Sequence, residues 1–179
     1  MKNVLILSTS FHKNSNSDYL AQEFAKGAEA AGNSVEMIRL AGKKLNFCIG
    51  CMACHRTQKC VIPDDAVQIA EKVKRADVLV LATPIYYYEM CGQMKTLLDR
   101  MNPLFTADYS FRDVYLLTTA ADEEESAMDG AVKGMQGWVD CFAKAKLCGV
   151  VRGTGISDAG EAKEHGGILK ETYALGKAV

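Results

Sequence analysis

Residues 3–31 read NVLILSTSFHKNSNSDYLAQEFAKGAEAA, and the three parts of this stretch predict a strand, a polar loop and a helix in that order. The residues at 3–7 are almost all apolar, which is typical of a parallel strand buried on both faces. After the polar loop, Leu20, Phe24 and Ala28 recur at helical spacing. A strand, loop and helix in this order are the first part of a βαβ unit.

The same alternation continues along the rest of the chain. Further strands are predicted at 34–40, 77–82, 112–118 and 147–151, and further helices at about 64–75, 92–101, 128–146 and 166–178. Five strands alternating with five helices are typical of a doubly wound parallel sheet with helices on both faces. We therefore predict an α/β fold with strand order 2-1-3-4-5, formed by a single domain over residues 1–179.

Composition and charge narrow the classes of partner. The chain has 179 residues, of which 49% are hydrophobic and 24% charged, as in a globular protein. A formal net charge of −1 provides no electrostatic footprint for nucleic acid or an anionic membrane. No apolar run approaches the roughly 18 residues of a membrane span, and the short run near the N-terminus lacks the features of a secretion signal. We expect a cytoplasmic protein whose cysteines are kept reduced.

The loops after the first and third strands are expected to meet at the topological switch point, where such sheets bind ligands. The first of these loops, Ser8–Ser17, is rich in hydroxyl side chains and directly precedes a helix. Hydroxyl groups and free backbone N–H groups at a helix N-terminus suit a phosphate. The loop contains neither GxGxxG nor GxxxxGK[ST], which disfavours a dinucleotide or nucleoside triphosphate held in the usual way. A plain helix cap with a solvated turn is the alternative interpretation.

The loop after the third strand, Thr83–Met90, contains three consecutive tyrosines. Aromatic side chains at this position can flank a flat ring system, although packing under a long loop is the simpler interpretation for any one of them. A phosphate-type loop and an aromatic loop at one switch point together favour flavin mononucleotide as the ligand.

A cluster of cysteines lies between the second strand and the following helix. Residues 48–60 read CIGCMACHRTQKC and hold Cys48, Cys51, Cys54 and Cys60, four of the seven cysteines in the chain. Four closely spaced thiolates are what a [4Fe-4S] cluster requires. A zinc site usually separates two CxxC pairs by a longer loop, and a redox CxxC pair is a further alternative. The spacing leaves a cluster-bearing loop and a metal-free loop both open.

Three stretches resemble a known family. STSFHKNSNS at 8–17, CIGCMACHRTQKCVIPDD at 48–65 and TPIYYYEMCGQMKTLLDR at 83–100 are similar to the flavodoxin-like NADPH-dependent FMN reductases and, among them, the iron–sulfur flavoproteins. The resemblance implies FMN as cofactor, NAD(P)H as electron donor and a homodimer. It implies that the FMN phosphate contacts Ser10, Ser15, Asn16 and Ser17, that the flavin ring contacts Pro84, Ile85, Tyr86, Tyr87 and Tyr88, and that Thr118 and Thr119 contribute from the acidic third loop.

The resulting functional prediction is an FMN-dependent NAD(P)H oxidoreductase. The flavin carries the chemistry, so no side chain is predicted to act as a catalytic acid or base. The electron acceptor is a free flavin, a quinone, another small molecule or a redox protein, and a cluster at residues 48–60 would relay single electrons. The alternative is an electron carrier of the flavodoxin or iron–sulfur flavoprotein type, without a small-molecule substrate of its own.

Overall fold

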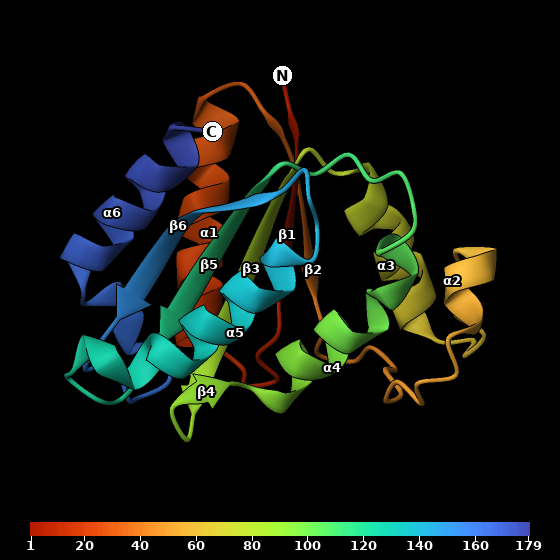
Figure 1. The fold of residues 1–179 in the computed structure, drawn as a ribbon. Helices are drawn as coiled ribbons and strands as arrows, with labels where there is room; N and C mark the ends of the chain where they lie inside the picture. The colour runs from red at the N-terminus through yellow and green to blue at the C-terminus, as the bar shows by residue number, and fades with distance from the viewer.

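The computed structural model describes all 179 residues and contains a parallel sheet with helices on both faces (Figure 1). The strands are β1 (Asn3–Ser8), β2 (Ser34–Arg39), β3 (Val78–Tyr86), β4 (Glu89–Met90), β5 (Asp113–Thr119) and β6 (Lys146–Gly153). The α-helices are α1 (Asn16–Ala30), α2 (Ala53–Thr57), α3 (Asp65–Arg75), α4 (Gly92–Arg100), α5 (Asp129–Asp140) and α6 (Gly166–Lys177). The parallel strands lie in the order β2-β1-β3-β5-β6, which confirms the predicted order 2-1-3-4-5.

Two cores form because successive side chains of a strand point to opposite faces of the sheet. On one face, Leu5 and Leu79 belong to a buried cluster with residues of α3, α4 and α5. On the other face, Ile6 and Val80 pack with α1, and α6 covers the same side. Figure 1 shows α1 and α6 side by side on this second face. No helix of the structure combines the length and apolar character that crossing a membrane requires.

Two glycines allow α1 and α6 to pack closely. A Cβ atom on Gly27 would collide with the backbone carbonyl oxygen of Tyr173, and one on Gly176 would collide with that of Phe24. Because backbone rather than flexible side-chain ends form these contacts, neither position can accept a side chain without moving a helix.

The third strand is longer than predicted. It continues past Ala82 to Tyr86 and then turns back into β4, so that Ile85 pairs with Met90 in an antiparallel register. The two residues at the tip, Tyr87 and Tyr88, have φ angles of 50° and 63°. Two left-handed residues are what a tight hairpin turn requires, but such turns usually contain Asn or Gly, so the sequence carries no signal for this one.

The helix predicted at 128–146 is shorter than expected and ends at Asp140. The chain then turns, with the N–H of Phe142 donating to the carbonyl of Val139 at 2.8 Å. This turn places the Phe142 ring edge-on against Tyr109 and Phe111, with centroid separations of 5.2 Å. The helix therefore ends before its periodic pattern does, and Phe142 packs into an aromatic cluster.

Candidate cofactor site

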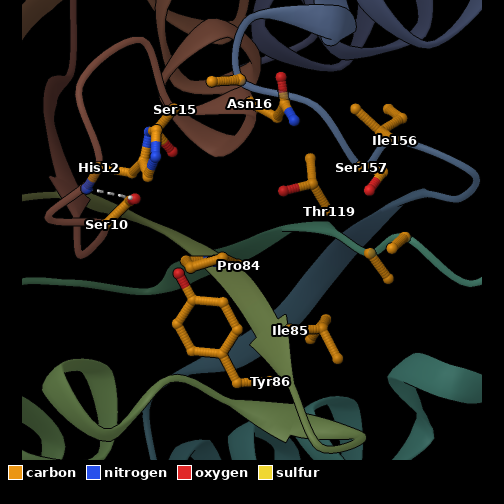
Figure 2. A pocket seen from close by; sticks show the side chains of 13 residues that line it. Ser10, His12, Ser15, Asn16, Pro84, Ile85, Tyr86, Thr119, Ile156 and Ser157 are labelled. Atoms are coloured by element: carbon orange, nitrogen blue, oxygen red, sulfur yellow. Dashed lines mark hydrogen bonds between the residues drawn. The ribbon is translucent and has the colours of Figure 1, made fainter.

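A hollow of about 250 Å³ lies at the carboxyl ends of β1, β3 and β5 (Figure 2). It is the position that the switch-point rule predicts for a ligand in a sheet of this order. The loop after β1 and the last residues of β3 both contribute to it, although they are far apart in the sequence. The hollow brings together these residues predicted from the sequence: Ser10, Ser15, Asn16, Pro84, Ile85, Tyr86 and Thr119.

One side of the hollow is the N-terminus of α1. Ser15 is the N-cap residue, and its Oγ lies 2.9 Å from Oγ of Ser17 instead of capping the helix. The backbone N–H groups of Asn16 and Ser17 make no hydrogen bonds within the chain. Free N–H groups, hydroxyls and the positive end of the helix dipole make this terminus suited to an anion. Ser17 is fully buried and supports Ser15 without lining the hollow itself.

An acidic side chain, Asp18, lies in the same helical turn but is paired with a cation. The carboxylate of Asp18 accepts a hydrogen bond from the hydroxyl of Ser8 and one from Nε of Arg39 at 2.9 Å. Because Asp18 is buried and paired on the side away from the hollow, its charge is compensated within the protein. The N-terminus of α1 thus retains its preference for an anion.

The opposite part of the hollow is partly apolar and includes an aromatic ring. Pro84, Ile85 and Tyr86 come from the end of β3, and Figure 2 shows the Tyr86 ring below Pro84 at the edge of the hollow. Tyr87 is completely exposed, and the hydroxyl of Tyr88 lies 3.4 Å from the carboxylate of Asp122. Of the three consecutive tyrosines, only Tyr86 lines the hollow.

The two threonines predicted from the third loop have different surroundings. Thr119 lines the hollow. Thr118 is fully buried, and its hydroxyl donates to the backbone carbonyl of Val151 at 2.8 Å. The hydroxyl of Thr118 therefore links β5 to β6, and only Thr119 is placed to meet a ligand.

Sequence reasoning missed the contribution of the segment after β6. Ile156, Ser157 and Ala159 line the hollow together with His12, Ala120 and Ala121. The segment reads GISDAG at 155–160 and contains no phosphate-binding or aromatic motif. The only signal available was positional, because the last parallel strand also ends at the ligand-binding edge of the sheet.

The four clustered cysteines line a second, smaller hollow beside the C-terminal end of α4. Cys54 is buried, Cys60 is half-buried, and Cys48 and Cys51 are exposed. Left-handed residues at Gly50, Met52 and Gln58 fold the segment tightly around the one-turn helix α2. No three of these thiols converge on a common metal position in this arrangement. The spacing thus brings the cysteines into one hollow without bringing them to ligand distance.

Two side chains from the end of α4 and the turn after it contact this cysteine segment. Nη2 of Arg100 donates to Sγ of Cys60, and Nδ2 of Asn102 donates to Sγ of Cys54, both at 3.3 Å. Donors of this kind stabilise negative charge on sulfur. Hydrogen bonds to sulfur of this kind also surround the cysteine ligands of iron–sulfur clusters.

Arg100 is held by a buried ion pair with Asp64. Its Nη1 and Nη2 lie 2.6 and 2.8 Å from the two carboxylate oxygens, and the side chains are 0% and 3% exposed. Burial alone would raise the pKa of Asp64, but hydrogen bonds from Arg100 and Asn46 lower it to about 2. Asp64 also caps α3 by accepting the N–H of Ala66 at 3.1 Å.

A doubly wound parallel sheet with an anion-binding helix terminus and an aromatic wall at one carboxyl-edge hollow defines a flavodoxin-like protein. Residues 2–142 match the family model for NADPH-dependent FMN reductases, and the chain belongs to that family. This confirms both the fold and the resemblance found in the sequence.

Individual relatives agree with this assignment. An iron–sulfur flavoprotein of Methanocaldococcus jannaschii is 39% identical over 101 residues, which are 56% of this chain and 52% of that protein. One from Archaeoglobus fulgidus is 37% identical over 103 residues, or 58% and 46% of the two chains. The chain thus spans about half the length of these curated relatives. Among solved structures, an NAD(P)H:quinone oxidoreductase from Methanothermobacter marburgensis shares the fold with a TM-score of 0.75 at 18% identity, covering 98% of this chain and 94% of that one.

Proposed function

We propose that this protein is an FMN-dependent NAD(P)H oxidoreductase that reduces a small acceptor such as a quinone or a free flavin. The observation that carries the proposal is the junction, in one hollow, of the α1 N-terminus with the aromatic end of β3. Membership of the NADPH-dependent FMN reductase family supports it. When bound, FMN supplies both hydride and single-electron chemistry.

The residues of the hollow fit the two ends of FMN. The unpaired N–H groups of Asn16 and Ser17 and the hydroxyls of Ser10 and Ser15 suit the phosphate. The partly apolar surface around Tyr86 suits the ring. The chain's task here is to bind and orient the cofactor and to keep water from one face of the ring, since flavin chemistry needs no general base from the protein.

We also propose that the segment at 48–60 holds an iron–sulfur cluster on Cys48, Cys51, Cys54 and Cys60. Supporting this are the shared hollow, the hydrogen bonds donated to sulfur, and the iron–sulfur flavoproteins among the relatives. Cluster binding requires the segment to rearrange so that the four thiols meet at one position. This hollow lies beside the C-terminal end of α4 and shares no lining residue with the cofactor hollow.

A homodimer follows from the family resemblance, and the exposed hairpin tip at Tyr87 and Tyr88 is the surface that supports it. Sedimentation of the wild-type protein and the Tyr87→Ser variant tests this proposal. A wild-type dimer that the substitution weakens supports contact through the hairpin, whereas a wild-type monomer contradicts the dimer.

Anaerobic purification followed by absorption spectroscopy and acceptor assays tests the function. Stoichiometric flavin with turnover of NAD(P)H and a quinone supports the oxidoreductase, while flavin without turnover indicates an electron carrier. A chain that neither retains nor rebinds flavin contradicts both. Iron and sulfide that are present in the wild type and in Cys141→Ala, but absent from Cys54→Ala, support the cluster; iron that survives in Cys54→Ala contradicts the assigned ligands.

A further inference from the structure

Residues 155–163, here called the β6–α6 segment, connect the first and third loops of the hollow. The N–H of Ile156 donates to the carbonyl of Ala120 in the third loop at 2.8 Å. Asn16, the first residue of α1, binds the other part of the segment. This segment lies outside the residues 2–142 that match the family model, so the match assigns it no role.

The side-chain amide of Asn16 is committed to this segment. Its Oδ1 accepts from the N–H groups of Gly160 and Ala162, both at 3.1 Å, and its Nδ2 donates to the carbonyl of Asp158 at 2.9 Å. Asn16 is only 9% exposed. An amide with three backbone partners on one segment fixes the position of that segment relative to the α1 N-terminus.

A hydrogen bond to Glu161 in the same segment holds Ser157 at the hollow. Its N–H and that of Asp158 donate to the carboxylate of Glu161 at 2.6 and 2.8 Å. These two bonds lower the pKa of Glu161, and the bond from Asp158 has the larger effect. The Ser157 hydroxyl makes no hydrogen bond within the chain, and Figure 2 shows Ser157 and Thr119 together at one side of the hollow. Asp158 does not line the hollow, so its charge is not directed at a bound anion.

We propose that the β6–α6 segment is a fourth cofactor-binding loop, in which Asn16 is the positioning residue and Ser157 donates a hydrogen bond to the phosphate-bearing end of the flavin nucleotide. The phosphate end is the one concerned because Asn16 begins the helix whose N-terminus suits the anion. The inference rests on the proposed function, since it requires that the hollow binds FMN. It assigns Asn16 a role distinct from direct phosphate binding by its side chain.

Flavin fluorescence titrations with FMN and with riboflavin, which lacks the phosphate, test the inference. The variants are Ser157→Ala, Asn16→Ala and, as a matched control, Ser34→Ala at an exposed serine at the start of β2. Ser157→Ala removes one hydrogen bond to a charged group. It should therefore bind FMN about tenfold or more weakly than the wild type and bind riboflavin equally well. Asn16→Ala should weaken FMN binding and also increase amide hydrogen exchange across residues 156–162.

The outcomes separate this inference from the function on which it rests. If the wild-type protein binds FMN and Ser157→Ala binds it equally well, the inference is overturned and the proposed function stands. If Ser157→Ala weakens FMN and riboflavin to the same extent, the segment is a structural support and the inference is again overturned. If the wild-type protein binds neither flavin, both the proposed function and the inference are overturned.

Discussion

Replacing Asp64 by Asn should destabilise the protein strongly, because it removes the only carboxylate paired with the buried guanidinium of Arg100. The Arg100 side chain is fully buried, and its remaining contacts are to the carbonyls of Asn46 and Ile62 and to the sulfur of Cys60. Leaving a buried charge without its partner typically costs about 3–5 kcal/mol. A second estimate comes from the pKa of Asp64, which lies at about 2 in place of 3.8. This shift corresponds to about 2.5 kcal/mol.

Both estimates are large against the roughly 5–15 kcal/mol that stabilises an ordinary domain. Urea unfolding followed by circular dichroism at pH 7 measures the effect. The matched control is Asp65→Asn, which changes the neighbouring carboxylate and keeps the pair, and we expect it to cost about 1 kcal/mol or less. The reasoning is refuted if Asp64→Asn lies within about 1 kcal/mol of the wild type or if the control costs as much.

The pH dependence gives the same prediction an independent check. The folded pKa of Asp64 is depressed, so its stabilisation is fully present above the unfolded value of 3.8 and is lost as the pH falls toward about 2. The difference in unfolding free energy between the wild type and Asp64→Asn should therefore be constant from pH 7 to near pH 5 and shrink between about pH 4 and 2. A difference that is unchanged at pH 2 contradicts the assigned cause.

Three further predictions concern the packing of α1 against α6, the hydrogen bond between β5 and β6, and the contact of Tyr86 with the flavin ring. Gly176→Ala should lower the unfolding free energy by about 2–4 kcal/mol, because the new Cβ collides with the backbone of α1. Gly137→Ala is the control: it lies in open space on α5 and should raise the unfolding free energy by about 0.5–1 kcal/mol. Thermal denaturation of both variants measures these effects. Thr118→Val should cost about 0.5–1.5 kcal/mol by removing the hydroxyl's hydrogen bond to the Val151 carbonyl, with FMN affinity unchanged, and a large loss of affinity in titration contradicts the orientation of Thr118. Tyr86→Ala should weaken FMN binding several-fold while Tyr87→Ala does not, as equilibrium dialysis can establish, and equal effects would contradict the placement of the two rings.

The strand order and the position of the site were predictable because they depend on local patterns and one topological rule. The apolar run in β1 and the helical spacing after it identify the first βα unit, and the switch-point rule then locates the hollow. The alternation of side chains along a strand could also have separated Thr118 from Thr119, since neighbours in a strand cannot both face one side.

Other features depend on contacts between residues distant in the sequence. The left-handed turn at Tyr87 and Tyr88 lies beside α5, where the carbonyl of Tyr88 would collide with any side chain at Gly130. Asn16 and Gly160 are joined by a hydrogen bond across 144 positions. The spacing of the four cysteines predicts that they share one place, but nothing in it indicates that Arg100, at the far end of α4, anchors the segment.

The most direct test of the account is the stoichiometry of FMN binding by the purified chain. We claim that the α1 N-terminus and the end of β3 bind the two ends of the same cofactor, so saturable quenching of flavin fluorescence should end at one FMN per chain. Addition of NAD(P)H should then bleach the blue flavin absorption band. Fluorescence that does not saturate, or that saturates equally well after Ser10 and Ser15 are replaced by bulky acidic residues, contradicts the claim.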